Sequence, residues 1–208
     1  RADNAFTHAL GPAYGVINSF LTSNVSNGQV LLQLAFLNLT DPRGGCLRAA
    51  PKNLEDLAIA ANNSWLISYD NMSRISPELS DGICRMSSGG AHATRTFYSN
   101  GEEFVLAARR PQILNAITEV ASRPDLLDRY IGVSTLEIQP SERLTESVFD
   151  ANFAEARPRL LGAILSALST VLARWDDPLP LDPPRMADFH HIAHAAGDHI
   201  PGGGATFD

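Results

Sequence analysis

Residues 65–69 constrain the fold more than any other stretch of the chain. They read Trp-Leu-Ile-Ser-Tyr, a short run that is aromatic, β-branched and mostly apolar on both faces. Such a run is typical of a central strand in a parallel sheet, because helices cover both faces of that sheet. Asp70 and Asn71 follow directly, so we expect them at the carboxyl end of the strand, where open α/β sheets bind ligands. A carboxylate there can serve a metal or a phosphate, or it can simply form an Asx-type turn.

Strand-like and helix-like segments alternate on either side of this run. Asn53, for example, is expected to cap a helix whose buried side carries Leu54, Leu57, Ile59 and Ala60. Strands that alternate with helices imply βαβ units, so the pattern predicts an α/β fold with a parallel sheet flanked by helices. The remaining expected strands are 15–22, 47–50, 111–115 and 131–138, and the remaining expected helices are 29–39, 76–86 and 124–128.

Two further patterns lie outside the sheet. Asn100-Gly101 separates two strand-like runs within residues 92–108, which is a strong signal for a β-hairpin. Residues 144–175 are helical in pattern, and Pro158 is expected to divide them into two helices. A short helix is expected at residues 186–196, followed by a glycine-rich tail.

Charge and composition exclude several classes of protein. The net charge of −7 argues against a protein that binds nucleic acid over its whole surface. Lys52 is the only lysine among sixteen basic residues, which restricts any phosphate loop that depends on a lysine. No apolar run approaches the 18 to 20 or so residues of a membrane span, so we expect a cytoplasmic protein without a membrane partner. Cys46 and Cys84 lack the spacing of a metal or redox pair.

Histidines cluster near the carboxyl end of the chain. His190 and His194 lie four residues apart on an expected helix and could share a zinc ion. No third ligand of assured geometry is evident in the sequence, and a solvated terminal helix is the alternative.

Polar residues recur at the ends of the expected strands. Asp70-Asn71 end one strand, Asn115 ends another, and Arg129 lies just beyond the helix that follows. Taken singly, an asparagine at a strand end is usually a turn former, and an arginine at a helix end usually compensates the helix dipole.

In the order and spacing of its motifs, the chain resembles the ATP-binding proteins of phages and mobile elements. These proteins are a branch of the AAA+ P-loop NTPases related to superfamily 3 helicases. The resemblance covers residues 28–189 and is densest at residues 48–51, 66–71, 79–81, 89–90, 110–117, 123–129, 156–161 and 184–189.

The resemblance implies an AAA+-like core at residues 1–140, a helical lid at 141–196 and a disordered tail at 197–208. It further implies a β-hairpin insertion, ATP and Mg²⁺ as cofactors, and assembly with like or related subunits into a ring. In the relatives a hairpin at the position of residues 92–108 tracks DNA. Here the tip, residues 99–103, holds two glutamates and no cation, so packing on the sheet or on a neighbouring subunit is the alternative.

Carried over residue by residue, the resemblance assigns roles to the polar positions. Asp70 looks like the acid that holds Mg²⁺ through water, and Asn71 stands where many relatives carry a second acid. Asn115 looks like the amide that senses the γ-phosphate. Arg129 looks like an arginine finger directed at a neighbouring subunit's nucleotide. Arg157 or Arg159 corresponds to a sensor in the lid. The shared logic is that phosphoryl transfer depends on placed cations and hydrogen-bond donors.

The chain departs from the family at the phosphate-binding loop. The family motif Gly-x-x-x-x-Gly-Lys-Ser/Thr falls at residues 23–30, where only Gly28 matches. Ser23 replaces the first glycine, Gln29 replaces the lysine, and Val30 replaces the hydroxyl residue that binds Mg²⁺. We therefore expect weak nucleotide binding and impaired hydrolysis. The alternatives are a non-hydrolysing structural or regulatory subunit and a decayed remnant without activity.

Overall fold

The computed structural model describes most of the chain, in two compact units made of residues 1–138 and 139–208. The described residues are 18–22, 27–42, 46–89, 91–95, 103–107, 109–116, 121–134, 138–178, 182 and 185–199. Ser23, the hairpin tip at residues 99–101 and the tail from residue 200 onward lie outside them. Each unit is described by itself.

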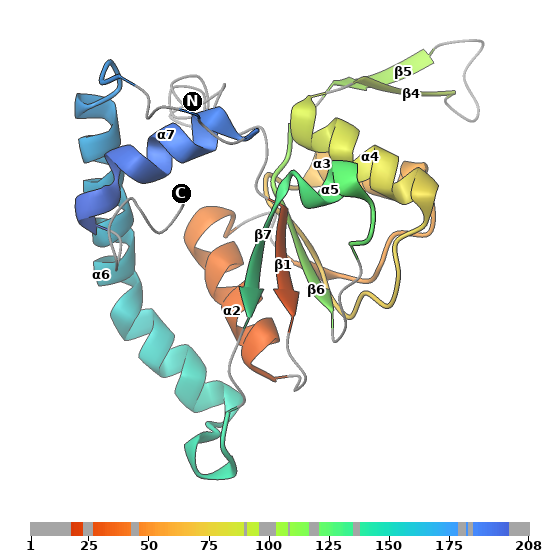
Figure 1. Ribbon diagram of the computed structural model, residues 1–208. Coiled ribbons are helices and arrows are strands. Elements are labelled where there is room, and N and C mark those ends of the chain that lie inside the picture. The colour runs from red at the N-terminus through yellow and green to blue at the C-terminus, as the bar shows by residue number, and fades with distance from the viewer. Residues whose placement is uncertain are drawn as a thin grey trace. The chain divides into compact units, whose positions relative to one another are not determined.

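A five-stranded parallel sheet forms the centre of the first unit, which confirms the predicted α/β class (Figure 1). All four strand pairings are parallel, and the order across the sheet is β2-β3-β6-β1-β7. The strands are β1 (Asn18–Thr22), β2 (Leu47–Arg48), β3 (Ile67–Tyr69), β6 (Gln112–Ala116) and β7 (Tyr130–Ser134).

Helices cover both faces of this sheet, so the two faces have separate cores. Figure 1 shows α2 on one side of the sheet and α3, α4 and α5 on the other. Their bounds are Asn27–Thr40 for α2, Leu54–Asn63 for α3, Pro77–Ser88 for α4 and Pro124–Leu127 for α5. The larger core lies under α3, α4 and α5, and it includes Leu57, Ile67, Tyr69, Ile83, Leu114 and Leu126. The smaller core lies under α2 and consists of Leu37, Leu66 and Ile113.

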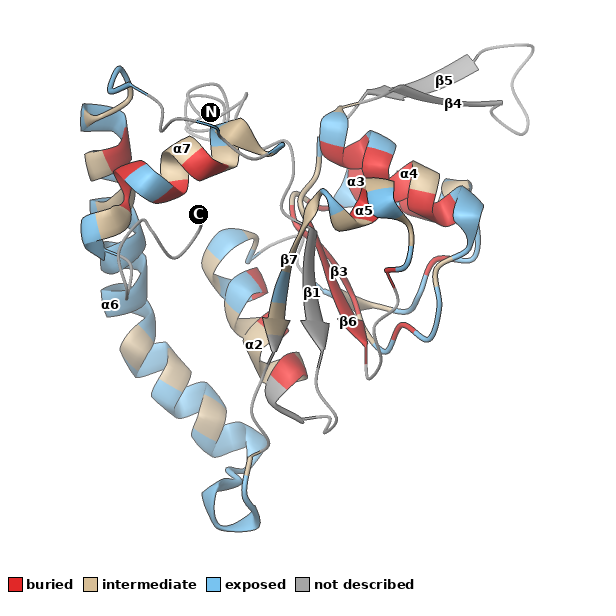
Figure 2. Cartoon of the chain, in the orientation of Figure 1, coloured by how far each residue is buried: buried red, intermediate tan, exposed pale blue. Residues whose placement is uncertain are grey.

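The alternation of side chains along β3 and β6 assigns each residue to one of these cores. Ile113 faces α2, whereas Leu114 faces the larger core, as successive residues of a strand must. Every residue of β3 and β6 is buried, which explains why the sequence at 65–69 is apolar on both faces (Figure 2). Burial also raises the pKa of Tyr69, so its phenol stays neutral.

Side-chain caps fix where two helices on the larger core, α3 and α4, begin. Asn53 accepts a hydrogen bond from the backbone N–H of Asp56 at 2.9 Å, which confirms the predicted cap of α3. Ser76 does the same for α4 through the N–H of Leu79, at 3.2 Å. Gly89 ends α4 in the left-handed conformation, with φ of 79°.

One predicted core residue of α3 is wrong. Ile59 is 60% exposed, and Ala58 and Ala61 are buried in its place. The buried side of α3 is centred on Leu57 and Ala61, which are four residues apart. Ile59 is two residues from each, so it lies about 200° around the helix and faces solvent.

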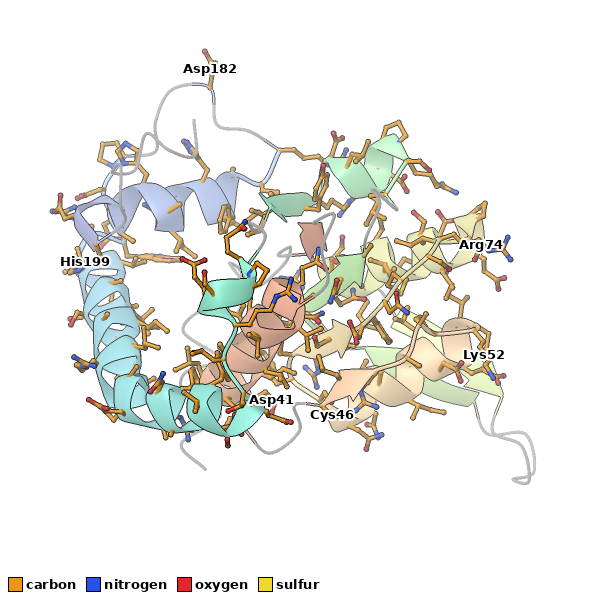
Figure 3. The ribbon with its side chains drawn as sticks, turned by 90° about the horizontal axis from the view of Figure 1, so that it is seen from below. Asp41, Cys46, Lys52, Arg74, Asp182 and His199 are labelled. Carbon is orange, nitrogen blue, oxygen red and sulfur yellow. The ribbon has the colours of Figure 1, made fainter. Side chains whose placement is uncertain are left out.

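A carboxylate at the end of α2 binds the backbone just before β3. Asp41, labelled in Figure 3, accepts hydrogen bonds from the backbone N–H groups of Trp65 at 2.6 Å and Leu66 at 3.1 Å. Arg110 lies over the Trp65 ring, 5.0 Å from its centroid. These contacts anchor the residues that lead into the central strand.

The predicted hairpin is present as a separate two-stranded sheet. Strands β4 (Ala91–Arg95) and β5 (Glu103–Ala107) pair in antiparallel register, with Arg95 opposite Glu103. The hairpin follows α4 directly and extends away from the five-stranded sheet (Figure 1).

The second unit consists of helices and short 3₁₀ turns. Helix α6 (Glu146–Ala173) packs with α7 (Ala187–Ala195) and the 3₁₀ turn η3 (Gly197–His199), and a further turn, η2 (Pro140–Glu142), precedes α6. Arg174 forms an ion pair with Asp198 at 2.7 Å, and Thr170 is hydrogen-bonded to His199 at 2.8 Å. The small core of this unit contains Val171, Ala195 and Ala196.

The predicted break at Pro158 is wrong, because α6 is one continuous helix through that residue. A proline inside a helix leaves the carbonyl four residues earlier without its usual partner. Here that carbonyl belongs to Ala154, which is exposed, so water can supply the missing hydrogen bond. The cost of the proline is therefore smaller than in a buried helix.

Helix α6 is long and apolar enough to cross a membrane by length and composition alone. Only 6% of its most apolar 18-residue window is buried. It passes this test alone among the helices in the described part of the chain.

Candidate functional site

The carboxyl edge of the sheet brings Asp70 and Asn115 into direct contact. Strands β3 and β6 are neighbours, and Tyr69 pairs with Leu114, so the next residue of each strand also lies side by side. The Nδ2 group of Asn115 donates a hydrogen bond to Oδ1 of Asp70 at 2.8 Å. Two of the three residues that the sequence predicts for this edge are therefore hydrogen-bonded to each other.

Two glutamines of α2 complete the site. Gln33, fully buried, accepts a hydrogen bond from Nδ2 of Asn115 at 3.2 Å and donates one to the carbonyl of Tyr69 at 3.0 Å. Gln29, one turn earlier and 1% exposed, donates to the carbonyl of Ala116 at 3.2 Å. The first turns of α2 are thus joined to the ends of β3 and β6 by amide groups. We refer to Gln29, Gln33, Asp70 and Asn115 as the amide–carboxylate cluster.

Gln33 is the member of this cluster that the sequence analysis does not identify. The signal is the spacing of Gln29 and Gln33, four residues apart on a helix that is otherwise mostly apolar. A pair at that spacing lies on one face of a helix. The sequence does not show that this face is the buried one, because the neighbouring leucines Leu32 and Leu34 are equally suited to face the core.

Asn71 adjoins the cluster and shapes the turn after β3. Its φ is 52°, in the left-handed region that asparagine tolerates better than most residues. The next residue, Met72, donates its backbone N–H to the carbonyl of Asn115 at 2.7 Å. Asn71 is exposed, so the structure gives it a role in turning the chain beside Asp70.

The cluster lies at a topological switch point of the sheet. Neighbouring strands β1 and β6 continue in opposite directions, β1 through α2 to β2 and β6 through α5 to β7. Helices α2 and α5 lie on opposite faces of the sheet. The chain therefore leaves the carboxyl end of β1 toward one face and the carboxyl end of β6 toward the other. Ligands of open α/β sheets bind at this place.

The loop that would hold a phosphate follows β1. Ser23 lies outside the described residues, and Gly28 falls in the first turn of α2, which begins at Asn27. Val30 is half-buried and offers no oxygen ligand. The amide of Gln29, at the position where the resemblance predicts a lysine in its relatives, donates to the carbonyl of Ala116 at the end of β6. The described part of this region therefore presents backbone N–H groups and no cationic side chain.

The amide–carboxylate cluster supplies one carboxylate as a ligand for a magnesium ion. Mg²⁺ in nucleotide sites is held by one or two carboxylates together with substrate phosphates. Asp70 supplies a single carboxylate, and one of its oxygens already accepts from Asn115. The described residues contain no group of three or more His, Cys, Asp or Glu side chains that could hold a metal ion. His190 and His194, whose ring centroids lie 6.2 Å apart, therefore belong to no such group among the described residues.

Arg129 lies at the other end of the sheet, where the strands begin. It immediately precedes β7, whose first residue pairs with the first residue of β1, whereas the cluster lies where the strands end. Its Nη1 donates a hydrogen bond to the hydroxyl of Ser88 at the end of α4. The structure thus separates Arg129 from Asp70 and Asn115 within one chain.

Arg157 and Arg159 belong to the second unit. Both are exposed on α6, on either side of Pro158. The first unit contains neither, so their assignment to a nucleotide site stays a prediction.

Cys84 and Cys46 differ in their surroundings, which predicts different reactivity. Burial, together with the nearby carboxylate of Asp125, raises the pKa of the Cys84 thiol from 9.0 to about 11. Cys46, labelled in Figure 3, is exposed. We expect one thiol per chain to react rapidly with a disulfide reagent in the folded protein, and two after denaturation.

The same pKa predicts an alkaline change in stability. The folded state holds the Cys84 proton more tightly than the unfolded state, so the free energy of unfolding falls as the pH rises from about 9 to about 11. Urea titrations of the unmodified chain and of Cys84→Ser measure this change. An equal alkaline loss in both would contradict the assignment to Cys84.

Over residues 4–200 the chain matches the family described as actinomycete integrative conjugative element replication protein. A search among curated proteins finds no match.

Proposed function

Because the chain belongs to the actinomycete integrative conjugative element replication proteins, we propose that it acts in the replication of such a mobile element. Within that role, residues 1–138 are proposed to be a nucleotide-binding module of the P-loop NTPase type with little or no hydrolytic activity. Residues 141–196 are proposed to be its helical lid, and the cytoplasm is its proposed location.

The observation that carries the proposal is the amide–carboxylate cluster at the switch point. Asn115 lies on β6, between the strand that ends in Asp70 and the strand that leads to α2. An amide beside a carboxylate and a helix N-terminus lies where a bound phosphate group would, and for Asn115 to donate to that group its bond to Asp70 or to Gln33 has to open. The order of strands thus supports the roles that the resemblance gives to Asp70 and Asn115.

The same cluster supports weak binding without efficient hydrolysis. Gln29 carries no charge, and its amide binds a backbone carbonyl. The lost lysine contact and the lost hydroxyl at Val30 would each remove on the order of several kcal/mol of transition-state stabilisation. ATP, with Mg²⁺ bound mainly through the phosphates, is therefore proposed as a weakly held ligand.

Calorimetric titration with ATP, with and without Mg²⁺, tests this function. We expect a Kd well above micromolar and no measurable turnover for the unmodified chain. The double variant Gln29→Lys with Val30→Ser should bind ATP at least about tenfold more tightly, a gain of about 1.4 kcal/mol. Phe36→Lys is the matched control, because it adds the same charge at an exposed position of the same helix.

Two results would contradict the proposal in different ways. Micromolar, Mg²⁺-dependent binding by the unmodified chain would show that the altered loop is a working nucleotide site. No binding by either the unmodified chain or the double variant would remove nucleotide binding altogether and leave a structural protein.

A non-catalytic subunit role is the second candidate, and the position of Arg129 favours it. An arginine at the end of the sheet opposite the cluster is separated from its own chain's site, which favours a role toward a neighbour's site. Under this reading the chain stimulates ATP hydrolysis by an intact relative, and Arg129→Ala abolishes the stimulation. The β4–β5 hairpin is then the proposed site of contact with DNA.

A further inference from the structure

Helix α6 carries an apolar stripe that the second unit leaves uncovered. Leu161, Leu165, Leu168 and Leu172 follow one another at steps of four, three and four residues. Three of them are between 40% and 49% exposed, and Leu168 is half-buried. Figure 2 shows α6 mostly in the exposed and intermediate colours along its length. We call these four residues the leucine stripe.

The spacing of the stripe identifies the shape of its partner. Steps of four and three residues repeat every seven, which is the pattern of a helix that packs along another helix. The neighbouring apolar residues Leu160 and Ile164 are also more than 40% exposed and widen the surface on one side. Helix α7 packs on α6 through a small cluster that contains Val171 and Ala195, and none of the four stripe residues belongs to that cluster.

A lipid bilayer is a poorer partner for this helix. The uncharged run between Arg159 and Arg174 is 14 residues long. At 1.5 Å per residue it spans about 21 Å, against about 30 Å for the hydrocarbon core of a membrane.

The described part of the first unit offers no matching stripe. Its large apolar side chains with high exposure are Phe36 on α2 and Ile59 on α3, one on each helix. Every other such side chain in the described residues lies between Leu144 and Leu172. Within the described part of the chain, the surface that best complements α6 is therefore another α6.

We propose that the leucine stripe is the contact surface for α6 of a second copy of this chain, with the two helices antiparallel. In a two-fold arrangement centred between Leu165 and Leu168, these two residues face each other across the pair. Leu161 then faces Leu172 of the other copy. Such an interface is isologous, so it closes a dimer.

Charge at the ends of the stripe favours the antiparallel direction. Arg157 lies just before the stripe, and Asp176 and Asp177 lie just after it. In a parallel pair each charged residue would lie beside the same residue of the other chain, and like charges repel. Helix α6 ends at Ala173, so Asp176 and Asp177 lie in the turn after it, and in the antiparallel pair Arg157 lies toward the end of the other copy's helix that this turn follows. Arg174 is already paired with Asp198 within its own chain.

Light scattering after gel filtration tests the interface on the full chain. The unmodified chain should have the molar mass of a dimer, and Leu165→Asp with Leu168→Asp should halve it. Ile59→Asp is the matched control, because it places the same charge at a 60% exposed isoleucine outside α6 and should leave the dimer intact. Circular dichroism checks that helix content is unchanged in each variant.

Cysteine cross-linking tests the direction of the helices. In a Cys46→Ser background, one chain carries Leu161→Cys and another carries Leu172→Cys. Oxidation should cross-link the mixture and neither chain alone, because residues 161 and 172 meet only in the antiparallel pair. Cross-linking of the Leu161→Cys chain with itself would overturn the antiparallel direction.

Three results would overturn the proposed interface itself. One is that the unmodified chain is a monomer at every concentration measured, which would mean that a segment of the same chain covers the stripe. Another is a dimer that survives both aspartates. The third is a monomer that floats with phosphatidylglycerol vesicles and loses that binding in the double variant.

Discussion

Replacing Asn115 with aspartate should destabilise the protein more than any other single change at the cluster. The Nδ2 group of Asn115 donates to Asp70 at 2.8 Å and to Gln33 at 3.2 Å, and the side chain is 4% exposed. Aspartate keeps the shape but replaces a donor with an anion beside another carboxylate. A buried charge without a partner costs about 3–5 kcal/mol, so we expect a loss of that size in the free energy of unfolding.

Asn115→Leu is the control, because it removes the donor without adding charge. It leaves two acceptors unpaired and should cost about 1–3 kcal/mol. Acid should distinguish the two variants in urea titrations, since a protonated carboxyl at position 115 can donate again and a leucine cannot. If Asn115→Asp proves as stable as Asn115→Leu at neutral pH, Asp70 and residue 115 do not face each other as described.

Replacing Gly82 with valine should be the second large effect, because α3 and α4 approach closely there. A Cβ atom at Gly82 would lie 2.4 Å from Cδ2 of Leu54 and 3.0 Å from Cδ2 of Leu57. Leu54 is half-buried and can move, whereas Leu57 is 2% exposed and fixed in the core. Overpacking of this kind costs about 1–3 kcal/mol, and we expect the upper part of that range.

Gly162→Ala is the matched control, since Gly162 also lies in a helix but has nothing within 4 Å of its added Cβ. There the change should stabilise the helix by about 0.5–1 kcal/mol through propensity alone. The midpoint and slope of urea denaturation measure both variants. A stable Gly82→Val would mean that α3 and α4 do not touch at this glycine.

The sequence predicted the parts of the fold that depend on local patterns. The run at 65–69, the cap at Asn53, the hairpin after α4 and the polar residues Asp70 and Asn115 each follow from a few neighbouring residues. Local patterns were less reliable where burial decides the outcome. Ile59 and Pro158 both differ from expectation because the side of the helix that faces solvent is set by its neighbours in space.

The sequence by itself determined that Asp70 and Asn115 would lie at one edge of a parallel sheet, because the carboxyl ends of parallel strands share an edge. Only the tertiary structure decided that Gln29 and Gln33 turn inward to meet them and that Arg129 lies at the far edge. The reason is that the inward face of α2 depends on how the helix crosses the sheet, and strand order depends on crossovers between distant residues. Residue spacing along the chain encodes neither of these.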